Sequence, residues 1–327
     1  MPQTDEQRWL GFDLGGSKML AAVFDSTFAI QGRERKRTKG REGPTVVVNR
    51  MFKAIRDALE SASVSANQLA GIGVGVPGPV DEENGLVLEA VNLSWEKLPL
   101  GKLLKEEFGC PVVLTNDVDA GVYGEYRFGA GREARTVLGV FPGTGIGGGC
   151  VYSGEIVRGK NMSCMEIGHI QVTREGRLCG CGRRGCLETE ASRLAVAAEV
   201  ATAAFRGEAP HALAECGTDI TNIRSGALAR AISAGDHVVE DIVRQAARQL
   251  GVAISGVVHV LAPDSIVLGG GLAEAMPKLY TNVVTDAINR RVMPSFVDSF
   301  QITVAQLGDD AAIMGAAAWA AKRLTTG

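Results

Sequence analysis

Apolar residues at the start of the chain fall into short runs that glycines interrupt. Residues 8–13 and 19–24 are apolar and β-capable, and Gly15 and Gly16 lie between them. Two such runs joined by a glycine turn predict a β-hairpin. Residues 45–62 then place apolar side chains at helical spacing, which predicts an amphipathic helix.

Further along, apolar runs of strand length alternate with helical patterns. Residues 70–78 and 111–120 predict buried strands, and residues 98–109 predict a helix between them. The small residues of the segment 309–324 predict a helix suited to close packing. Strands that alternate with helices indicate an α/β fold.

The hairpin pattern occurs a second time. Residues 136–157 again form an apolar run, a glycine-rich turn and a second apolar run. The two patterns begin about 130 residues apart, which is an interval of domain size. We therefore expect two related α/β domains in tandem.

The composition is that of an ordinary globular protein and narrows the classes of partner. Of the 327 residues, 22% are charged and 46% are hydrophobic, and the net charge is -3. This balance favours neither a nucleic-acid partner nor an anionic membrane surface. The first residues lack the pattern of a signal peptide, and no apolar run reaches the length of a membrane span. We expect a cytoplasmic protein without a membrane segment.

Three glycine-rich turns have the chemistry of nucleotide binding. In DLGGSK, residues 13–18, exposed backbone N–H groups can bind phosphate oxygens, and Asp13 can position Mg²⁺ through water. In GTGIGGG, residues 143–149, Thr144 adds a hydroxyl to a second such turn. A base or ribose could lie against residues 269–271. Ordinary turns are the alternative for all three, and the spacing of a Walker A motif is absent.

Asn116 and Asp117 follow an apolar strand in the segment LTNDVDA. Ligands bind at the carboxyl ends of strands in open α/β sheets. Asp117 could accept a proton from an attacking hydroxyl, and Asn116 could orient that hydroxyl. Helix capping is the alternative, because Asn and Asp are favoured N-cap residues. Asp119 is a second candidate for the base, two residues further into the expected helix.

Three of the seven cysteines lie close together in CGCGRRGCLE. Cys179, Cys181 and Cys186, with His169 upstream, would complete the four N/S ligands of a structural zinc site. A redox cluster or buried free thiols are the alternatives. The other four cysteines are expected to be small buried side chains.

Glu166 and Glu188 lie on either side of these cysteines in the sequence. If the zinc loop fixes them, the two carboxylates could accept hydrogen bonds from sugar hydroxyls. Ordinary surface carboxylates are the alternative.

These segments together resemble the ROK family, which contains bacterial sugar kinases and related sugar-responsive repressors. The resemblance covers nearly the whole chain and rests on DLGGSK, GVPGPVDEENG, NLSW, LTNDVDA, GTGIGGG, EIGH, CGCGRRGCLE and VLGGGL. It implies an α/β fold of the actin/hexokinase-like ATPase type, with two related ribonuclease H-like domains around a central cleft. We expect a smaller domain from residues 1–118 and 305–327, and a larger one with the zinc loop from residues 119–304.

The resemblance also assigns roles by position in these motifs. The catalytic base matches Asp117, and Mg²⁺ would lie near Asp13. The sugar contacts match Gly78, Asn92, Asn116, Asp117, Glu166, His169 and Glu188. The ATP contacts match Asp13, Gly15, Gly16, Ser17, Lys18, Gly143, Thr144, Gly145, Gly270 and Gly271. The structural Zn²⁺ matches His169, Cys179, Cys181 and Cys186. Two departures from the family pattern are Ser17, where many members have Thr, and the pair Phe141 and Pro142 before the second glycine turn.

The implied reaction is transfer of a phosphoryl group from ATP to the 6-hydroxyl of a hexose. The segment after the Pro-Gly loop resembles the glucokinase branch, so glucose is the expected sugar. Fructose, mannose, allose, N-acetylglucosamine and N-acetylmannosamine are alternative sugars, and polyphosphate is an alternative donor. Relatives of this kind are often homodimers or homotetramers, and we expect one of these here.

Other functional classes stay open beside this one. A non-catalytic sugar-responsive regulator of the same family is the first. A repressor with an N-terminal DNA-binding module is disfavoured, because Asp13 lies so near the start of the sequence. An ATP-hydrolysing activator or chaperone of the same superfamily is disfavoured by the zinc loop and its carboxylates.

Overall fold

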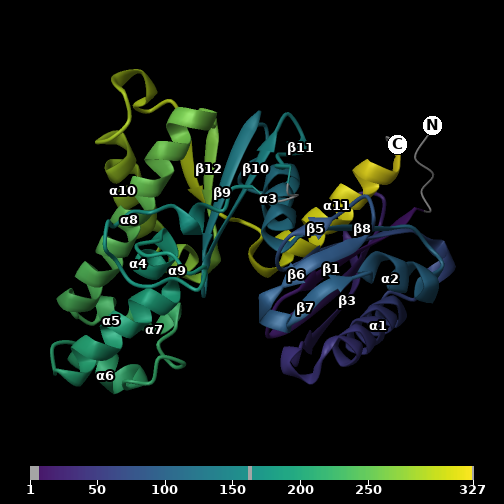
Figure 1. The fold of residues 1–327 in the computed structure, drawn as a ribbon, viewed down its shortest axis with the longest axis horizontal. Coiled ribbons are helices and arrows are strands. Elements are labelled where there is room, and N and C mark those ends of the chain that lie inside the picture. Colours follow the sequence, from purple (N-terminus) through teal and green to yellow (C-terminus); the bar gives the residue numbers. More distant parts are fainter. Residues whose placement is uncertain (1–6, 161–163, 326–327) are drawn as a thin grey trace. The chain divides into compact units, whose positions relative to one another are not determined.

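The computed structural model describes residues 7–160 and 164–325, and its contacts divide the chain into two compact units (Figure 1). Unit 1 comprises residues 1–132, 154–164 and 309–327, and unit 2 comprises residues 133–153 and 165–308. The expectation about a leader concerns a segment whose residues 1–6 lie outside the described part of the chain. Among the described residues, no helix is both long enough and apolar enough to cross a membrane.

The first sheet has the strand order β3-β2-β1-β4-β8. β1 is antiparallel to β2 and parallel to β4, which is parallel to β8. The strands are β1 (Arg8–Leu14), β2 (Lys18–Phe24), β3 (Ile30–Arg37), β4 (Leu69–Val76) and β8 (Val112–Asn116). The other elements of unit 1 are a small sheet of β5 (Val80–Asp81), β6 (Leu86–Ala90) and β7 (Trp95–Leu98), and the helices α1 (Pro44–Ser61), α2 (Leu100–Phe108), α3 (Asp117–Phe128) and α11 (Ala311–Thr325).

Helices cover both faces of the first sheet, with α1 on one side and α11 on the other (Figure 1). Side chains alternate between the faces of a strand. Leu10 and Phe12 of β1 accordingly belong to the core beneath α1, and Trp9 belongs to the cluster with Ile313 of α11. The helices expected over residues 45–62 and 309–324 are confirmed, as are the strands expected over residues 8–13, 19–24 and 70–78. The strand expected over residues 111–120 is shorter than predicted, because it ends at Asn116, where α3 begins.

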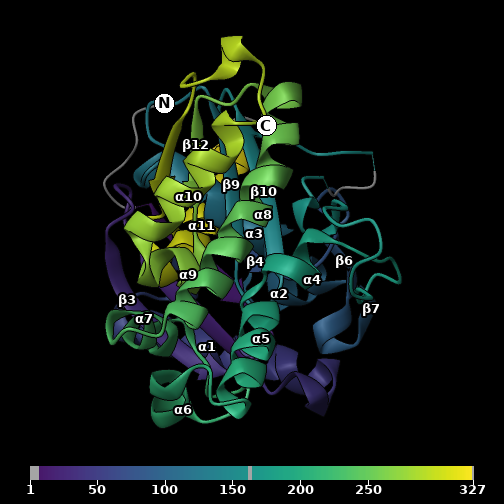
Figure 2. The same ribbon diagram turned by 90° about the vertical axis from the view of Figure 1, so that its left-hand side faces the viewer.

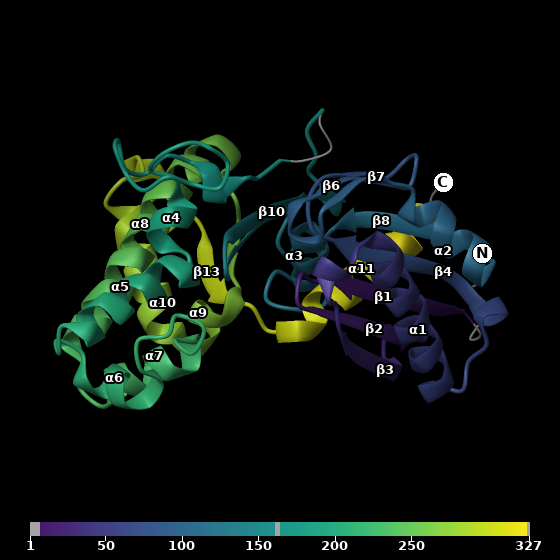
Figure 3. The ribbon, with the colours of Figure 1, turned by 60° about the horizontal axis from the view of Figure 1, so that its bottom comes forward.

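The second sheet has the strand order β11-β10-β9-β12-β13. Its strands are β9 (Thr136–Pro142), β10 (Ile146–Tyr152), β11 (Glu155–Ile156), β12 (Ser265–Leu268) and β13 (Gln301–Val304). The helices of unit 2 are α4 (Leu187–Ala191), α5 (Arg193–Phe205), α6 (Pro210–Cys216), α7 (Ser225–Ser233), α8 (His237–Leu261), α9 (Gly270–Ala275) and α10 (Pro277–Asn289). The long helix α8 packs beside α10 over this sheet (Figure 2), and α5, α6 and α7 form a group next to it (Figure 3).

The two sheets repeat one topology, as the doubled hairpin pattern predicted. β9 is antiparallel to β10 and parallel to β12, and β12 is parallel to β13. These are the relations of β1 to β2 and β4, and of β4 to β8. The two glycine turns therefore occupy equivalent positions in two related α/β units.

The boundary between the units differs from the expected one. The prediction ended the first domain at residue 118, whereas unit 1 continues to residue 132 and includes α3. α3 packs closely on α11, because a Cβ added to Gly315 would lie 1.7 Å from the Ala120 carbonyl oxygen. A second difference is the segment 154–164, which belongs to unit 1 although the chain before and after it belongs to unit 2.

Candidate active site and metal centre

The first glycine turn closes tightly and leaves polar groups exposed. The Gly15 N–H donates to the Lys18 carbonyl oxygen at 2.9 Å, and a Cβ added to Gly15 would approach that oxygen equally closely. Asn92 lies beside the turn, 3.6 Å from where a Cβ of Gly16 would stand. Ser17 is exposed, and the Lys18 ammonium forms a half-exposed ion pair of 2.6 Å with Asp309.

Asp13 stands at the carboxyl end of β1, immediately before this turn. Burial first and the Asp117 carboxylate second raise the pKa of its carboxyl, which Lys18 lowers, and the net effect is a rise from 3.8 to about 7. Asp13 and Asp117 are therefore close enough to repel each other. The two acids lie at the ends of β1 and β8, which are separated in the sheet by β4, and a cation bound near both would relieve that repulsion.

Asn116 and Asp117 lie where β8 meets α3. Asn116 is the N-cap of α3: its side-chain oxygen accepts from the N–H groups of Val118 and Asp119, at 2.9 and 3.1 Å. Its amide nitrogen donates to the Gly78 carbonyl oxygen at 3.1 Å. Asn116 therefore does cap the helix, as the alternative interpretation held. The same side chain also binds the loop at Pro77 and Gly78, the Pro-Gly loop. Asp117 is half-buried and Asp119 is buried, so Asp117 is the more accessible acid.

The second glycine turn lies against Glu188. The Ile146 N–H donates to the Glu188 carboxylate at 3.1 Å, and a Cβ added to Gly145 would lie 2.2 Å from the same oxygen. Thr144 accepts a hydrogen bond of 3.0 Å from Arg193, whose backbone N–H donates to the Gly143 carbonyl oxygen. Glu188 therefore supports this turn by a contact within unit 2.

The third glycine turn joins β12 to α9. Phe141 packs on it so closely that a Cβ at Gly269 would lie 2.0 Å from the ring, and a Cβ at Gly270 would lie 2.7 Å from the Pro142 carbonyl oxygen. Gly270 also has a positive φ of 77°. The Phe141-Pro142 pair thus sets the contact between the second and third turns.

The four expected zinc ligands lie together. One ligand atom each from His169, Cys179, Cys181 and Cys186 falls within 4.8 Å of all the others. The Nδ1 of His169 is 3.6 Å from the sulfur of Cys179, and the sulfurs of Cys181 and Cys186 are 3.7 Å apart. A tetrahedral zinc with Zn–S bonds of about 2.3 Å requires sulfur separations of about 3.8 Å, whereas a disulfide requires about 2.05 Å. The donor set and its spacing fit zinc.

Burial and nearby backbone N–H groups shift the pKa values of the three clustered thiols. Burial raises the pKa of the Cys186 thiol to about 12 and also raises that of Cys179. A backbone N–H from Arg183 lowers the pKa of the Cys181 thiol. Metal binding requires thiolates, so a cation bound here would displace the protons that burial favours on Cys179 and Cys186.

The predicted residues thus gather within their own units. Unit 1 contains the first glycine turn, Asp13, Gly78, Asn92, Asn116 and Asp117. Unit 2 contains the second and third turns, Glu166, Glu188 and the four-ligand cluster. Glu166 and His169 are exposed at the two ends of a short turn, and the Cys179 sulfur lies 3.8 Å from Glu188. The second turn and the metal cluster are therefore linked through Glu188.

Sequence reasoning missed two features of unit 2. The first is Arg193, whose contact with Thr144 spans 49 positions and has no local signature. The second is a groove of about 680 Å³ that includes Thr144 and Glu188 but not Gly270 or Gly271. The other residues along this groove come from the cysteine-rich segment, from α4 and α5 with the residues next to them, and from the start of α8. Apart from Gly180 of the cysteine motif, none of them belongs to a motif that the sequence analysis singled out.

Comparison with known proteins supports the assignment of fold and family. The ROK family model matches residues 9–323. A glucokinase of Halalkalibacterium halodurans is 33% identical over 313 residues, which cover 94% of this chain and 93% of the relative. A crystal structure of a ROK family glucokinase from Streptomyces griseus, in complex with glucose and AMPPNP, is 31% identical and superposes with a TM-score of 0.84. That match covers 96% of this chain and 99% of the other, and confirms the actin/hexokinase-like ATPase fold.

The relatives also include regulators. The xylose repressor of Caldicellulosiruptor bescii is 25% identical over 306 residues, which cover 94% of this chain and 76% of the repressor. The family therefore combines kinases and repressors on one fold, and fold alone does not decide between them. With a family model that spans 315 of 327 positions (9 to 323), this chain belongs to the ROK family.

Proposed function

We propose that this protein is an ATP-dependent sugar kinase that phosphorylates the 6-hydroxyl of a hexose, with glucose as the first candidate. The arrangement of Asn116, Asp117 and Gly78 carries the proposal. Asn116 fixes the β8–α3 junction to the Gly78 loop, which leaves the half-buried Asp117 carboxylate at the carboxyl end of a sheet strand. That is the edge at which α/β sheets bind ligands.

In this mechanism Asp117 is the general base. Its carboxylate accepts the proton of the sugar hydroxyl as that oxygen attacks the γ-phosphorus of ATP. The bond between the γ-phosphorus and the bridging oxygen breaks, and ADP leaves with the electron pair. Because the transition state is loose, positioning and charge stabilisation supply most of the rate.

The glycine turns would bind the nucleotide. Their backbone N–H groups, with the hydroxyls of Ser17 and Thr144 and the Lys18 ammonium, would bind phosphate oxygens. Gly270 and Gly271 would accommodate adenosine. Asp13 would hold Mg²⁺ through water, and the ion would supply charge neutralisation at the phosphates. Asp13 would act as the ionised acid once that cation is present.

Zinc would have a structural role. The ligands would be His169 through Nδ1 and the three clustered cysteines, and four protein ligands leave no open position for catalysis. The other ring nitrogen of His169, with Glu166 and Glu188, would then contact the sugar. Bound zinc supplies rigidity to the loop that carries these side chains.

The direct test is ADP release with Mg-ATP against a panel of glucose, fructose, mannose, allose, N-acetylglucosamine and N-acetylmannosamine. Glucose should give the highest kcat/KM, and ³¹P NMR of the product should show a phosphomonoester at O6. Polyphosphate should be tested as the donor in parallel. Absence of phosphorylation with every sugar and both donors, from protein that contains one zinc per chain, would refute the kinase assignment.

A sugar-responsive regulator is the second candidate, and the 25% identity to a xylose repressor is the observation that favours it. Such a protein would bind its sugar without turnover. Sugar binding by calorimetry without ADP release would identify the regulator.

The proposed kinase would be cytoplasmic and would form a homodimer or homotetramer, without nucleic-acid or membrane partners.

A further inference from the structure

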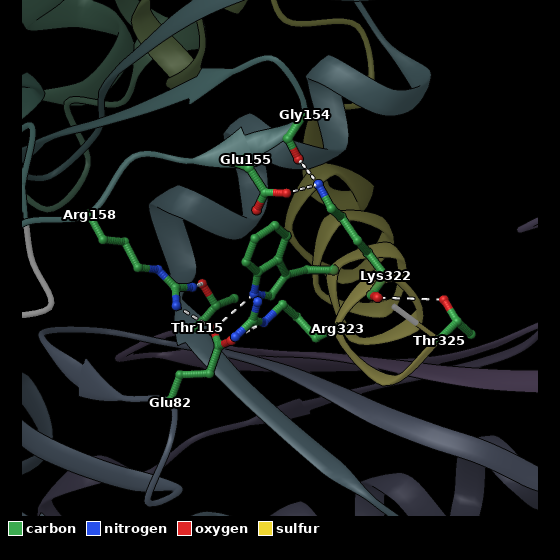
Figure 4. Close-up of polar contacts among 9 residues, drawn as sticks. Glu82, Thr115, Gly154, Glu155, Arg158, Lys322, Arg323 and Thr325 are labelled. Carbon is green, nitrogen blue, oxygen red and sulfur yellow. Dashed lines mark hydrogen bonds and ion pairs between the residues drawn. The ribbon is translucent and has the colours of Figure 1, made fainter. Parts of the chain in front are cut away.

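The carboxylate of Glu82 is a buried charge in unit 1 at which several donors meet (Figure 4). Its side chain is only 9% exposed. It accepts hydrogen bonds from the indole nitrogen of Trp319 at 2.9 Å and from Arg323 at 2.7 Å, and it forms an ion pair with Arg158. These donors come from α11 and from the segment 154–164, so Glu82 joins three parts of the chain.

Arg158 makes further contacts that orient its guanidinium group. It donates to the Thr115 hydroxyl at 3.1 Å, and its guanidinium carbon lies 5.2 Å from the centre of the Trp319 ring. The side chain is 19% exposed. The planar, rigid guanidinium can satisfy a carboxylate and a hydroxyl at once, which a lysine ammonium does not do with the same geometry.

Both polar partners of Arg158 are connected to the proposed sugar site. Thr115 is buried in β8 and directly precedes Asn116 and Asp117. Glu82 follows β5, the strand after the Gly78 loop, and Asn116 donates to Gly78. Contacts and chain together form a closed ring through Arg158, Thr115, Asn116, the Gly78 loop and Glu82.

The start of the segment that carries Arg158 is held by α11 of the same unit. Lys322 of α11 donates to the Gly154 carbonyl oxygen at 2.5 Å and pairs with Glu155 (Figure 4). The chain enters this segment from unit 2 after Ser153 and returns to unit 2 at Met165, next to Glu166. The segment is therefore anchored at its beginning by Lys322 and in its middle by Arg158.

We propose that Arg158 is a positioning residue for the sugar site: it holds the end of β8, with Asn116 and Asp117, in register with the Gly78 loop. The role rests on the proposed kinase function. A buried ion pair contributes little net stability compared with an apolar replacement of similar volume, because desolvation offsets its attraction. The directed contact from Arg158 to Thr115 is what an apolar side chain could not replace.

The test uses the full-length protein and four substitutions. R158M removes both polar contacts, and T115V removes only the hydroxyl while preserving shape. T115S keeps the hydroxyl, and R323Q removes a partner of Glu82 without touching Thr115. For each variant, kcat, the KM for glucose and the KM for ATP are measured together with the thermal midpoint.

R158M should lower kcat/KM for glucose by about 10–100-fold and T115V by about 3–10-fold, since small displacements of catalytic groups have effects of this size. The KM for ATP should stay within about twofold of the wild-type value in both variants, and T115S and R323Q should retain wild-type sugar kinetics. In the R158M background, T115V should have little additional effect, because both remove the same contact.

Several outcomes would overturn the positioning role. One is wild-type sugar kinetics in folded T115V, which stays informative even if R158M fails to fold. Another is an equal loss in T115V and T115S, and a third is a loss that follows the thermal midpoint across all four variants. A wild-type protein that binds no sugar would refute the proposed function and this role with it. Active wild-type enzyme with unchanged variants would refute only the role.

Discussion

Asn116 donates a hydrogen bond of 3.1 Å to the Gly78 carbonyl oxygen while its side-chain oxygen caps α3. One amide side chain thus joins the Pro-Gly loop to the helix that begins at Asp117. The loop must pass close to a neighbouring strand, because Gly78 has a φ of 87° and a Cβ there would lie 2.1 Å from the Glu89 carbonyl oxygen. The edge of unit 1 at which we propose that the sugar binds is therefore built from backbone that only a few residue types allow.

The two functions of Asn116 can be separated by substitution. N116A removes both the cap and the Gly78 contact, so it should lower the free energy of unfolding by about 0.5–2 kcal/mol and weaken glucose binding. N116S keeps a capping oxygen but cannot reach Gly78, so it should keep most of the stability and still raise the KM for glucose. Urea unfolding and steady-state kinetics check both. Equal glucose KM values for N116S and the wild type would show that the Gly78 contact does not matter for the sugar.

Asp13 should make stability depend on pH. Its folded-state pKa of about 7 lies above the ordinary value of 3.8, so the folded state keeps a proton that the unfolded state loses. Between pH 4 and pH 7 the ligand-free protein should lose stability for this reason, and above pH 7 the loss should level off. D13N lacks the titrating group. It should be more stable than the wild type by a difference that grows from pH 5 to pH 8, on the order of a few kcal/mol.

Thermal melts of both proteins in metal-free buffer at pH 5, 6, 7 and 8 measure this difference. A stability difference that is the same at pH 5 and pH 8 would contradict the raised pKa. D13N should also lose Mg-dependent activity, because Asn cannot supply the negative charge that Asp13 offers to the cation.

The cysteine cluster should bind one zinc ion per chain. C181S should lose the metal and lower the thermal midpoint, because binding free energy at a structural site contributes to folding. C216S is the matched control, since Cys216 is half-buried and its thiol donates to the Ala212 carbonyl oxygen, outside the cluster. Elemental analysis and thermal melts give both readouts. Full zinc content in C181S, or equal zinc loss in C216S, would refute the ligand set.

Close helix packing on the first sheet should be intolerant of a single methyl group. A Cβ at Gly73 of β4 would lie 1.9 Å from the Ala316 carbonyl oxygen of α11, and backbone cannot move aside cheaply. G73A should therefore lower the free energy of unfolding by about 1–3 kcal/mol or more. The exposed Gly256 in α8 has nothing within 4 Å of such a Cβ, so G256A should raise it by about 0.5–1 kcal/mol. Denaturant unfolding of the two variants measures the contrast.

Local patterns were enough to predict the hairpins, the doubled topology and the gathering of His169 with the three cysteines. Each depends on residues that are close in sequence, such as the glycine turn between β1 and β2 or the three cysteines with His169. The ion pair of Glu82 with Arg158 spans 76 positions, and the bond from Arg323 to Glu82 spans 241. Such contacts depend on how the strands and α11 assemble, so no local signature announces them. The boundary at residue 132 follows from the contact of α3 with α11 and was missed for the same reason.

The role of Asp117 is tested most directly by D117N, measured for glucose binding by calorimetry and for ADP release with Mg-ATP. Asn has nearly the same shape but cannot accept the hydroxyl proton. D117N should bind glucose with near wild-type affinity and lower kcat by about 10²–10⁴-fold. Turnover within a few-fold of the wild type would show that another group is the base and would contradict the mechanism.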